Sequence, residues 1–169
     1  MRLIPVISFV GRHNSGKTSV LEKVVQVLSE GGFRVGIIKH SSEQFDIDVP
    51  EKDTFRLAKA GAKALTISSA SRFAYYRDVE REMSLTELVA LLGDELDIII
   101  TEGYKREDRP KIEVARREIS TELIKPSNLT ALVTDFPVDK EIGVPVFGFH
   151  EIEEISRFIV DNFLQNHVR

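Results

Sequence analysis

A glycine-rich segment near the amino terminus carries the residue types that bind a nucleoside triphosphate. The segment from Gly11 to Thr18 has the Gly-x-x-x-x-Gly-Lys-Thr spacing of the phosphate-binding loop known as Walker A. Its glycines let the backbone turn tightly and approach phosphate oxygens without a Cβ, and successive amides form an anion nest. Lys17 can bridge the β- and γ-phosphates, and the Thr18 hydroxyl can coordinate Mg²⁺.

The sequence therefore predicts a site for a purine nucleoside triphosphate with Mg²⁺. We expect the nucleotide to contact the whole loop and the residue that follows it. These residues are Gly11, Arg12, His13, Asn14, Ser15, Gly16, Lys17, Thr18 and Ser19.

The segments on either side of the loop have the pattern that its mechanism requires. Residues 3–10 form an apolar run typical of a buried strand, and residues 19–29 carry apolar side chains at helical spacing. Gly31 and Gly32 end that helix, and residues 33–38 form the next apolar run. Strand, helix and strand in this order predict a βαβ unit with a right-handed crossover.

The rest of the chain continues the alternation of strands and helices. It predicts an α/β fold of the P-loop NTPase type, with a mostly parallel sheet and helices on both faces. No Gly/Ser/Pro-rich linker divides residues 1–169, so we expect a single domain. Further strands are expected at 64–69, 72–77, 96–101, 111–115, 129–133 and 144–149, and helices at 54–60, 85–92 and 151–165.

Two acidic residues flank the apolar strand expected at 96–101. Asp97 lies near its start, and Glu102 follows its carboxyl end. Ligands of parallel α/β sheets bind beyond the carboxyl ends of the strands, so Glu102 is the better candidate to hold Mg²⁺ or its waters together with Thr18. With Lys17, Glu102 would form the catalytic pair. The alternative is that Glu102 is a solvated loop carboxylate.

A basic pair and an acidic loop follow the strand at 33–38. Lys39 could contact phosphate, and His40 could contact water, phosphate or metal, although a lone histidine is often structural. Asp46 lies in the following loop, which could order on the γ-phosphate and Mg²⁺ as a switch. An exposed polar loop is the alternative.

Residues 104–117 form a basic segment that leaves the strand ending near Glu102. Lys105 and Lys111 belong to it, diluted by three acidic residues. Such a segment could bind a second anionic ligand or a partner protein. A solvated loop and an edge strand explain the same pattern.

The composition excludes several function classes. The chain has no cysteine, which rules out disulfides, thiolate metal sites and a catalytic thiol. A formal net charge of −4 makes general nucleic-acid binding a poor candidate. No apolar run approaches the ~20 residues of a membrane span, and no cleavage site follows the first apolar run. We therefore expect a cytoplasmic protein that binds neither nucleic acid nor membranes.

Taken together, these motifs resemble the molybdopterin-guanine dinucleotide biosynthesis protein B (MobB) family. The order and spacing match over roughly residues 3–117. The matching segments are the phosphate-binding loop with Phe9 and Val10 before it, Ile38-Lys39-His40, Lys52-Asp53-Thr54-Phe55-Arg56, Ala60-Gly61-Ala62, Asp97-Ile98-Ile99-Ile100-Thr101-Glu102-Gly103-Tyr104-Lys105 and Pro110-Lys111-Ile112-Glu113-Val114.

This resemblance implies a GTP-binding accessory protein with weak GTPase activity. Its role would lie in the last step of molybdenum-cofactor maturation, where it would form a homodimer and assist a separate, MobA-type molybdopterin guanylyltransferase. The resemblance also implies that Asp53, Arg56, Lys105 and Lys111 lie in family motifs. The chain departs from the family after His40, where a second histidine is often found, and at Glu51, where glycine is common. Both departures fall in the candidate switch loop.

Guanine specificity needs a further residue, because the Asn-Lys-x-Asp segment of other GTPases is missing from the sequence. Asp135 follows the strand at 129–133, on the side of the sheet where ligands bind. Its carboxylate could accept hydrogen bonds from the guanine N1 and N2 donors, which adenine lacks.

Two other function classes fit the same loop. A small-molecule kinase or ATP-dependent ligase would place its acceptor near His40 and Lys105 and transfer phosphate to it. A nucleotide-controlled adaptor would bind a partner through the basic segment, and its hydrolysis would be incidental. Fold alone does not choose between these classes.

Overall fold

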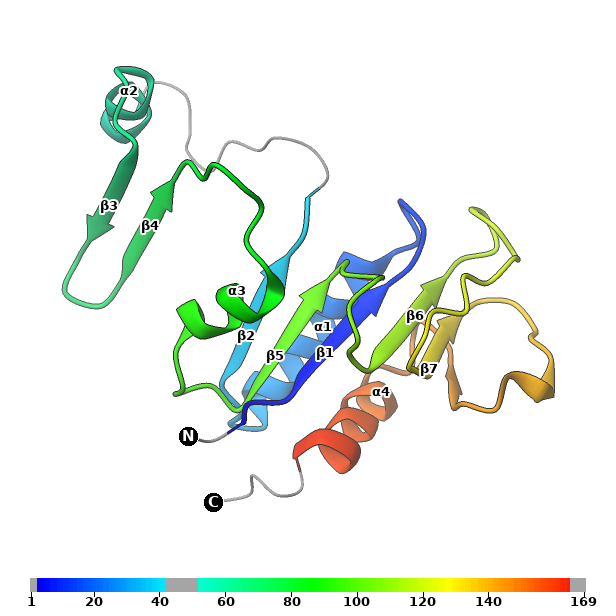
Figure 1. Cartoon of the computed structure of the whole chain (residues 1–169). Helices are drawn as coiled ribbons and strands as arrows, with labels where there is room; N and C mark the ends of the chain where they lie inside the picture. Colours follow the sequence, from blue (N-terminus) through cyan, green and yellow to red (C-terminus); the bar gives the residue numbers. More distant parts are fainter. Residues whose placement is uncertain (1–2, 42–51, 165–169) are drawn as a thin grey trace. The chain divides into compact units, whose positions relative to one another are not determined.

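The main element of the computed structural model is a six-stranded parallel sheet, whose strands lie side by side in Figure 1. The structure describes residues 3–41 and 52–164. The strands lie in the order β2-β5-β1-β6-β7-β8, and every neighbouring pair is parallel. Their carboxyl ends therefore meet at one edge, where such sheets bind ligands. The strands are β1 (Val6–Val10), β2 (Val35–Lys39), β5 (Ile98–Glu102), β6 (Lys111–Ala115), β7 (Leu129–Thr134) and β8 (Val146–Phe147).

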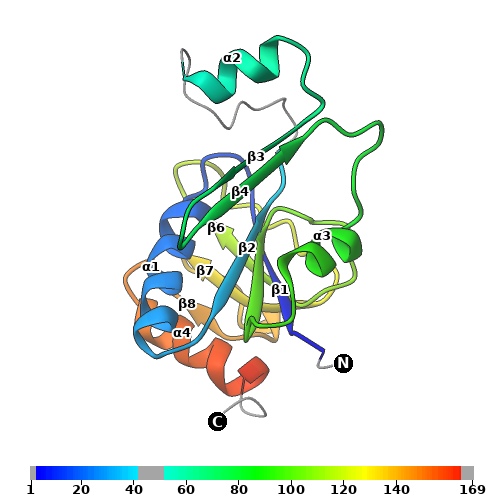
Figure 2. The ribbon, with the colours of Figure 1, turned by 90° about the vertical axis from the view of Figure 1, so that its left-hand side faces the viewer.

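Helices cover both faces of this sheet, as Figure 2 shows. On one face α1 (Lys17–Glu30) and α4 (Ile152–Ile159) lie side by side, and a π-helical turn, η2 (Val160–Leu164), extends α4. Their apolar stripes pack with the strands into the main core. On the other face α3 (Leu85–Leu92) packs Leu85 against β1, β2 and β5.

The chain separates into two compact units, residues 1–40 with 85–169 and residues 41–84. The second unit contains α2 (Asp53–Lys59) and an antiparallel hairpin of β3 (Ala64–Ser68) and β4 (Phe73–Arg77). Phe73 and Tyr75 on β4 are 74% and 51% exposed. The single domain expected from the sequence stays a prediction.

The predicted fold class is confirmed, and the differences concern the ends of elements. The first strand begins at Val6 rather than at residue 3, and the last one contains only Val146 and Phe147. That strand is short because Pro145 precedes it, and proline lacks the amide that would continue the ladder. A 3₁₀ turn, η1 (Lys140–Ile142), lies just before it.

The edge-strand interpretation of residues 111–115 is wrong. β6 lies between β1 and β7, and all five of its residues are buried. Its apolar residues Ile112 and Val114 belong to the main core. The charged residues of the segment had suggested exposure to solvent, whereas the strand lies in the centre of the sheet.

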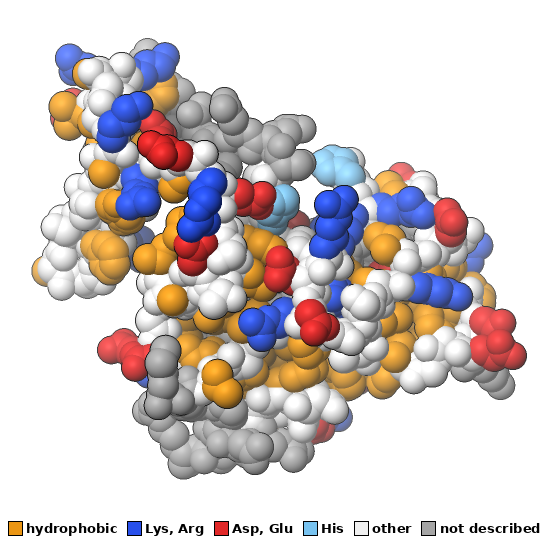
Figure 3. Space-filling model, in the orientation of Figure 1, with side chains coloured by type: hydrophobic (Ala, Val, Ile, Leu, Met, Phe, Trp, Pro, Cys, Tyr) orange, Lys and Arg blue, Asp and Glu red, His pale blue; other side chains and the backbone are white. Residues whose placement is uncertain are grey.

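The charged side chains of the first unit are not spread evenly. Lys, Arg and His side chains lie along the edge toward which the strands of the sheet point (Figure 3). No helix in the described part of the chain is long and apolar enough to cross a bilayer. The edge with these basic groups is where the site is built.

Candidate nucleotide-binding site

The glycine-rich segment forms the loop between β1 and α1, as its mechanism requires. Asn14 and Gly16 adopt left-handed backbone conformations, with φ of 60° and 88°, and α1 begins at Lys17. A Cβ at Gly11 would lie 2.3 Å from the Val114 carbonyl oxygen, so this glycine lets the loop pack against β6. The loop therefore directs the first amides of α1 toward the carboxyl edge of the sheet.

Lys17 folds back over the loop. Its ammonium donates to the Arg12 carbonyl at 2.7 Å. Burial lowers the pKa of Lys17, Glu102 opposes this shift, and the neighbouring cations Lys105 and Lys39 add to it. Two lysines from other parts of the chain thus disfavour the charged form of Lys17 at this edge, an effect that a polyanionic ligand would relieve.

Glu102 and Thr18 form the acidic part of the site. The Thr18 hydroxyl lies 2.9 and 3.0 Å from the two carboxylate oxygens of Glu102, and the Lys39 ammonium lies 3.4 Å from Oε2. Asp97 lies at the other end of β5, where it accepts hydrogen bonds from Arg34. The geometry thus brings Glu102 to the loop, as the direction of the strand predicted.

The oxygen donors at this point fit Mg²⁺. Mg²⁺ is usually held by one or two carboxylates, a hydroxyl and substrate phosphates, and it keeps several waters. Thr18 and Glu102 supply one hydroxyl and one carboxylate in direct contact. No cluster of three or more His, Asp or Glu side chains with metal-binding geometry occurs among the described residues. Phosphate and water would therefore complete the coordination.

His40 lies beside this pair, at the end of β2. Its amide donates to the Glu102 carbonyl at 3.0 Å, and its ring lies edge-on to the Tyr104 ring with centroids 5.2 Å apart. Gly103 permits this approach, since a Cβ there would lie 3.1 Å from the His40 Cβ. Lys105, two residues further along, is exposed.

Lys111 does not reach the site. It is 0% exposed, and its ammonium donates to the carbonyls of Glu107, Arg109 and Ser127, which precede β6 and β7. These carbonyls lie at the amino ends of the strands, whereas the phosphate-binding loop lies at the carboxyl ends. The geometry makes Lys111 a structural cation.

The other predicted residues have different outcomes. Asp46 lies outside the described residues. Asp53 and Arg56 belong to the second unit, where they form an exposed ion pair of 3.7 Å on α2. Asp135 follows β7 and is exposed, and its carboxylate accepts a hydrogen bond from the Arg117 amide at 2.7 Å. This bond joins the loops that follow β6 and β7.

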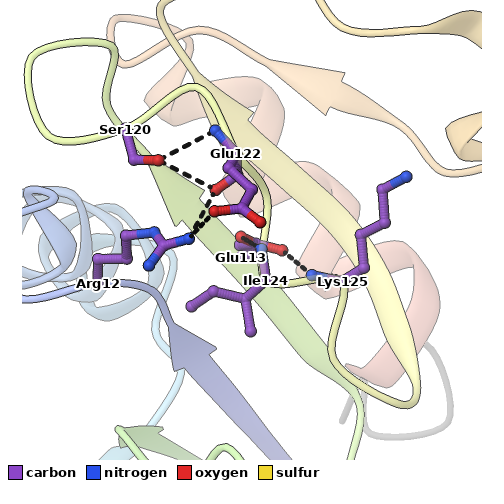
Figure 4. A network of polar contacts seen from close by, with 6 residues as sticks. All are labelled: Arg12, Glu113, Ser120, Glu122, Ile124 and Lys125. Carbon is purple, nitrogen blue, oxygen red and sulfur yellow. Dashed lines mark hydrogen bonds and ion pairs between the residues drawn. The ribbon is translucent and has the colours of Figure 1, made fainter.

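A polar network supports the phosphate-binding loop from the side of β6 (Figure 4). Glu113, 1% exposed, accepts hydrogen bonds from the amides of Ile124 and Lys125 at 2.6 and 3.0 Å. This anchors the segment that carries Glu122, whose carboxylate lies 3.0 Å from Arg12 Nη2. The loop residue Arg12 is thus tied to a segment more than a hundred positions away in the sequence.

Comparisons with known proteins agree with this geometry. The family model described as "Molybdopterin guanine dinucleotide synthesis protein B" matches residues 6–135. The chain belongs to the MobB family. It is 31% identical over 165 residues to the molybdopterin-guanine dinucleotide biosynthesis adapter protein of Escherichia coli, covering 94% of this chain and 93% of that protein.

Further similarities extend over nearly the whole chain. The adapter protein of Haemophilus influenzae is 31% identical over 165 residues, covering 96% of this chain and 91% of its own. The solved structure of Bacillus subtilis MobB superposes with a TM-score of 0.78 at 26% identity, covering 95% of this chain and 98% of that one. The resemblance noted from the motifs is confirmed.

Sequence reasoning missed two residues beside the loop of this MobB-family chain. The Arg116 guanidinium carbon lies 4.6 Å from the centroid of the Phe149 ring. A Cβ at Gly16 would lie 3.0 Å from Arg116 Nη2 and 3.1 Å from Phe149 Cε1. Arg116 lies within the basic segment 104–117 that the sequence had indicated, and each of the two residues follows an apolar strand run, so both had to come near the carboxyl edge.

Proposed function

We propose that this chain is a GTP-binding adapter protein of molybdopterin-guanine dinucleotide biosynthesis, with Mg²⁺ as the cofactor of the bound nucleotide. The observation that carries the proposal is the contact of Thr18 with Glu102, at the point where the phosphate-binding loop meets the end of β5. A P-loop protein needs a hydroxyl and a carboxylate at this place to hold Mg²⁺. The names of the relatives supply the biosynthetic step.

Within this proposal each charged residue has a task. Lys17 balances the β- and γ-phosphates, while Lys39, 3.4 Å from Glu102, keeps that carboxylate in place. Burial and the neighbouring lysines disfavour the charged form of Lys17. A bound triphosphate favours that form again, because an adjacent anion raises the pKa of a lysine.

Hydrolysis should be slow. Fast GTPases use a glutamine or an equivalent group to orient the attacking water and an arginine to stabilise the transition state. Arg12, the arginine of the loop itself, is held by Glu122 on the side of β6. Slow hydrolysis suits an adapter that stays in a GTP-bound conformation or passes its GTP to a partner protein.

Guanine selectivity is assigned to Asp135. The hydrogen bond from Arg117 fixes Oδ1, and the second carboxylate oxygen is available to a ligand at the same edge. A carboxylate prefers guanine over adenine because guanine presents N–H donors where adenine has none.

A homodimer is part of the proposal. The β3–β4 hairpin of the second unit exposes Phe73 and Tyr75 on one face and Ile67 on the other. A two-stranded hairpin is only marginally stable alone in water, and exposed large apolar side chains that lie together, as Phe73 and Tyr75 do, are typical of a protein interface. A second copy of the chain is the occupant that the family resemblance implies.

The adapter role is tested by binding to a MobA-type guanylyltransferase. A complex whose affinity rises when GTP and Mg²⁺ are added, and which Lys17→Ala makes insensitive to GTP, supports the proposal. Affinity that is equal with and without GTP contradicts it. Transfer of the γ-phosphate to a small acceptor, in place of release to water, would instead support the kinase or ligase alternative.

A further inference from the structure

The two sides of the phosphate-binding loop carry different groups. On the side of β5 and β2 lie Glu102, which contacts Thr18, and Lys39, which contacts Glu102. On the side of β6, β7 and β8 lie the segments that follow those strands. Thr18 and Glu102 would hold a bound Mg²⁺, which would neutralise the charge of the terminal phosphates. The γ-phosphate end of a nucleotide would then lie toward Glu102, and the nucleoside end would lie on the β6–β8 side.

Arg116 and Phe149 occupy this second side. Arg116 follows β6, Phe149 follows β8, and the two side chains pack on each other with 4.6 Å between the guanidinium carbon and the ring centroid. Both lie against Gly16, in the space that a side chain at position 16 would occupy. The missing side chain of Gly16 thus allows the pair to stand directly beside the loop.

The guanidinium of Arg116 contains a buried nitrogen that is left unpaired in the described part of the chain. This nitrogen is Nε, which makes no hydrogen bond among the described residues. Arg12 and Arg34 each pair with a carboxylate, although the Nε of Arg12 is also unpaired among the described residues. A half-buried guanidinium held only by an aromatic ring is a costly arrangement for a purely structural residue.

We infer that Arg116 and Phe149 form the platform on which the purine ring of the bound nucleotide stacks. This inference rests on the proposed nucleotide-binding function and adds its base subsite. A guanidinium is planar and stacks on flat π-systems, and the Phe149 ring holds it in that orientation before the ligand arrives. Asp135 is linked to the residue after Arg116 by the hydrogen bond to the Arg117 amide. The loops that follow β6 and β7 would thereby present both the guanidinium of Arg116 and the carboxylate of Asp135 to the base.

The test separates the base from the phosphates. Binding of GTP, GDP and inorganic tripolyphosphate, each with Mg²⁺, is measured by calorimetry on wild type, Arg116→Ala and Phe149→Leu. Arg157→Ala, an exposed position on α4, is the control that removes the same charge. Phe149→Leu keeps most of the apolar packing and removes only the ring, so it reports on the platform even where Arg116→Ala lowers stability.

Loss of one stacked base is worth about 5- to 150-fold in affinity. We expect Arg116→Ala to weaken GTP and GDP by a factor in this range and to leave tripolyphosphate within twofold of wild type, with a smaller loss for Phe149→Leu. The inference is overturned if both variants bind GTP as Arg157→Ala does. It is also overturned if tripolyphosphate weakens as much as GTP, which would make Arg116 a phosphate ligand. Wild type that binds tripolyphosphate but no nucleotide would overturn the proposed function itself.

Discussion

Removing the buried ammonium of Lys111 should destabilise the fold and spare the nucleotide site. Lys111→Met keeps the length and apolar character of the stem and deletes the three donated hydrogen bonds, to the carbonyls of Glu107, Arg109 and Ser127 at 2.5, 3.1 and 3.0 Å. A buried polar group left unsatisfied costs about 1–3 kcal/mol.

The expected size of the effect follows from these contacts. The three carbonyls belong to residues that are exposed (Glu107 and Ser127) or half-buried (Arg109), so the lower figure of about 1 kcal/mol per carbonyl applies. Removing an ammonium that is costly to bury offsets part of this sum. The expected loss in the free energy of unfolding is about 2–3 kcal/mol, a large share of the ~5–15 kcal/mol typical of a domain.

Urea unfolding followed by far-ultraviolet circular dichroism measures this loss, since the chain has no tryptophan to report by fluorescence. Lys105→Met is the matched control, because Lys105 is exposed and such changes usually stay within about 0.5 kcal/mol. If Lys111→Met were as stable as this control but lost nucleotide affinity, Lys111 would belong to a ligand site and the structural assignment would be wrong.

Four further outcomes follow from the site. Gly16→Ala should lower both the melting temperature and the affinity for GTP, because a Cβ at φ 88° costs about 1–2 kcal/mol and lies 3.0 Å from Arg116; an unchanged thermal scan contradicts this. GTP should bind more tightly with Mg²⁺ than in the presence of a metal chelator, and Glu102→Gln should reduce this difference in affinity; a difference as large as in wild type would show that Glu102 does not belong to the metal site. GTP affinity should fall as pH rises, and the fall should begin below pH 10.5, because binding needs charged Lys17 and burial lowers its pKa; calorimetry that gives a flat profile up to that pH refutes the role of burial. Asp135→Asn should erode the preference for GTP over ATP in competition binding, and equal losses for both nucleotides would remove Asp135 from base recognition.

The features that could be predicted from the sequence were those that depend on the pattern of apolar and polar residues within a short segment. The apolar run before Gly11 and the amphipathic run after Thr18 placed the phosphate-binding loop between a strand and a helix. The direction of the strand expected at 96–101 then placed Glu102 rather than Asp97 at the edge of the sheet where ligands bind. Both inferences needed only that parallel strands share a carboxyl edge.

The features that could not be predicted depend on the order of strands in the sheet. Lys111 is buried because β6 lies between β1 and β7, and its charged neighbours gave the opposite impression. Arg116 and Phe149 come from separate segments that only the β1-β6-β7-β8 order brings to Gly16. Arg12 and Glu122 also lie far apart in the sequence, and no periodic pattern of residues indicates that they pair.

The central claim is that the loop from Gly11 to Thr18 binds GTP with Mg²⁺. Calorimetric titration of wild type and Lys17→Ala with GTP and with ATP, in the presence of Mg²⁺, tests it directly. We expect wild type to bind GTP more tightly than ATP, and Lys17→Ala to lose GTP binding while its circular dichroism spectrum stays unchanged. Equal GTP affinity in wild type and a folded Lys17→Ala protein would contradict the account.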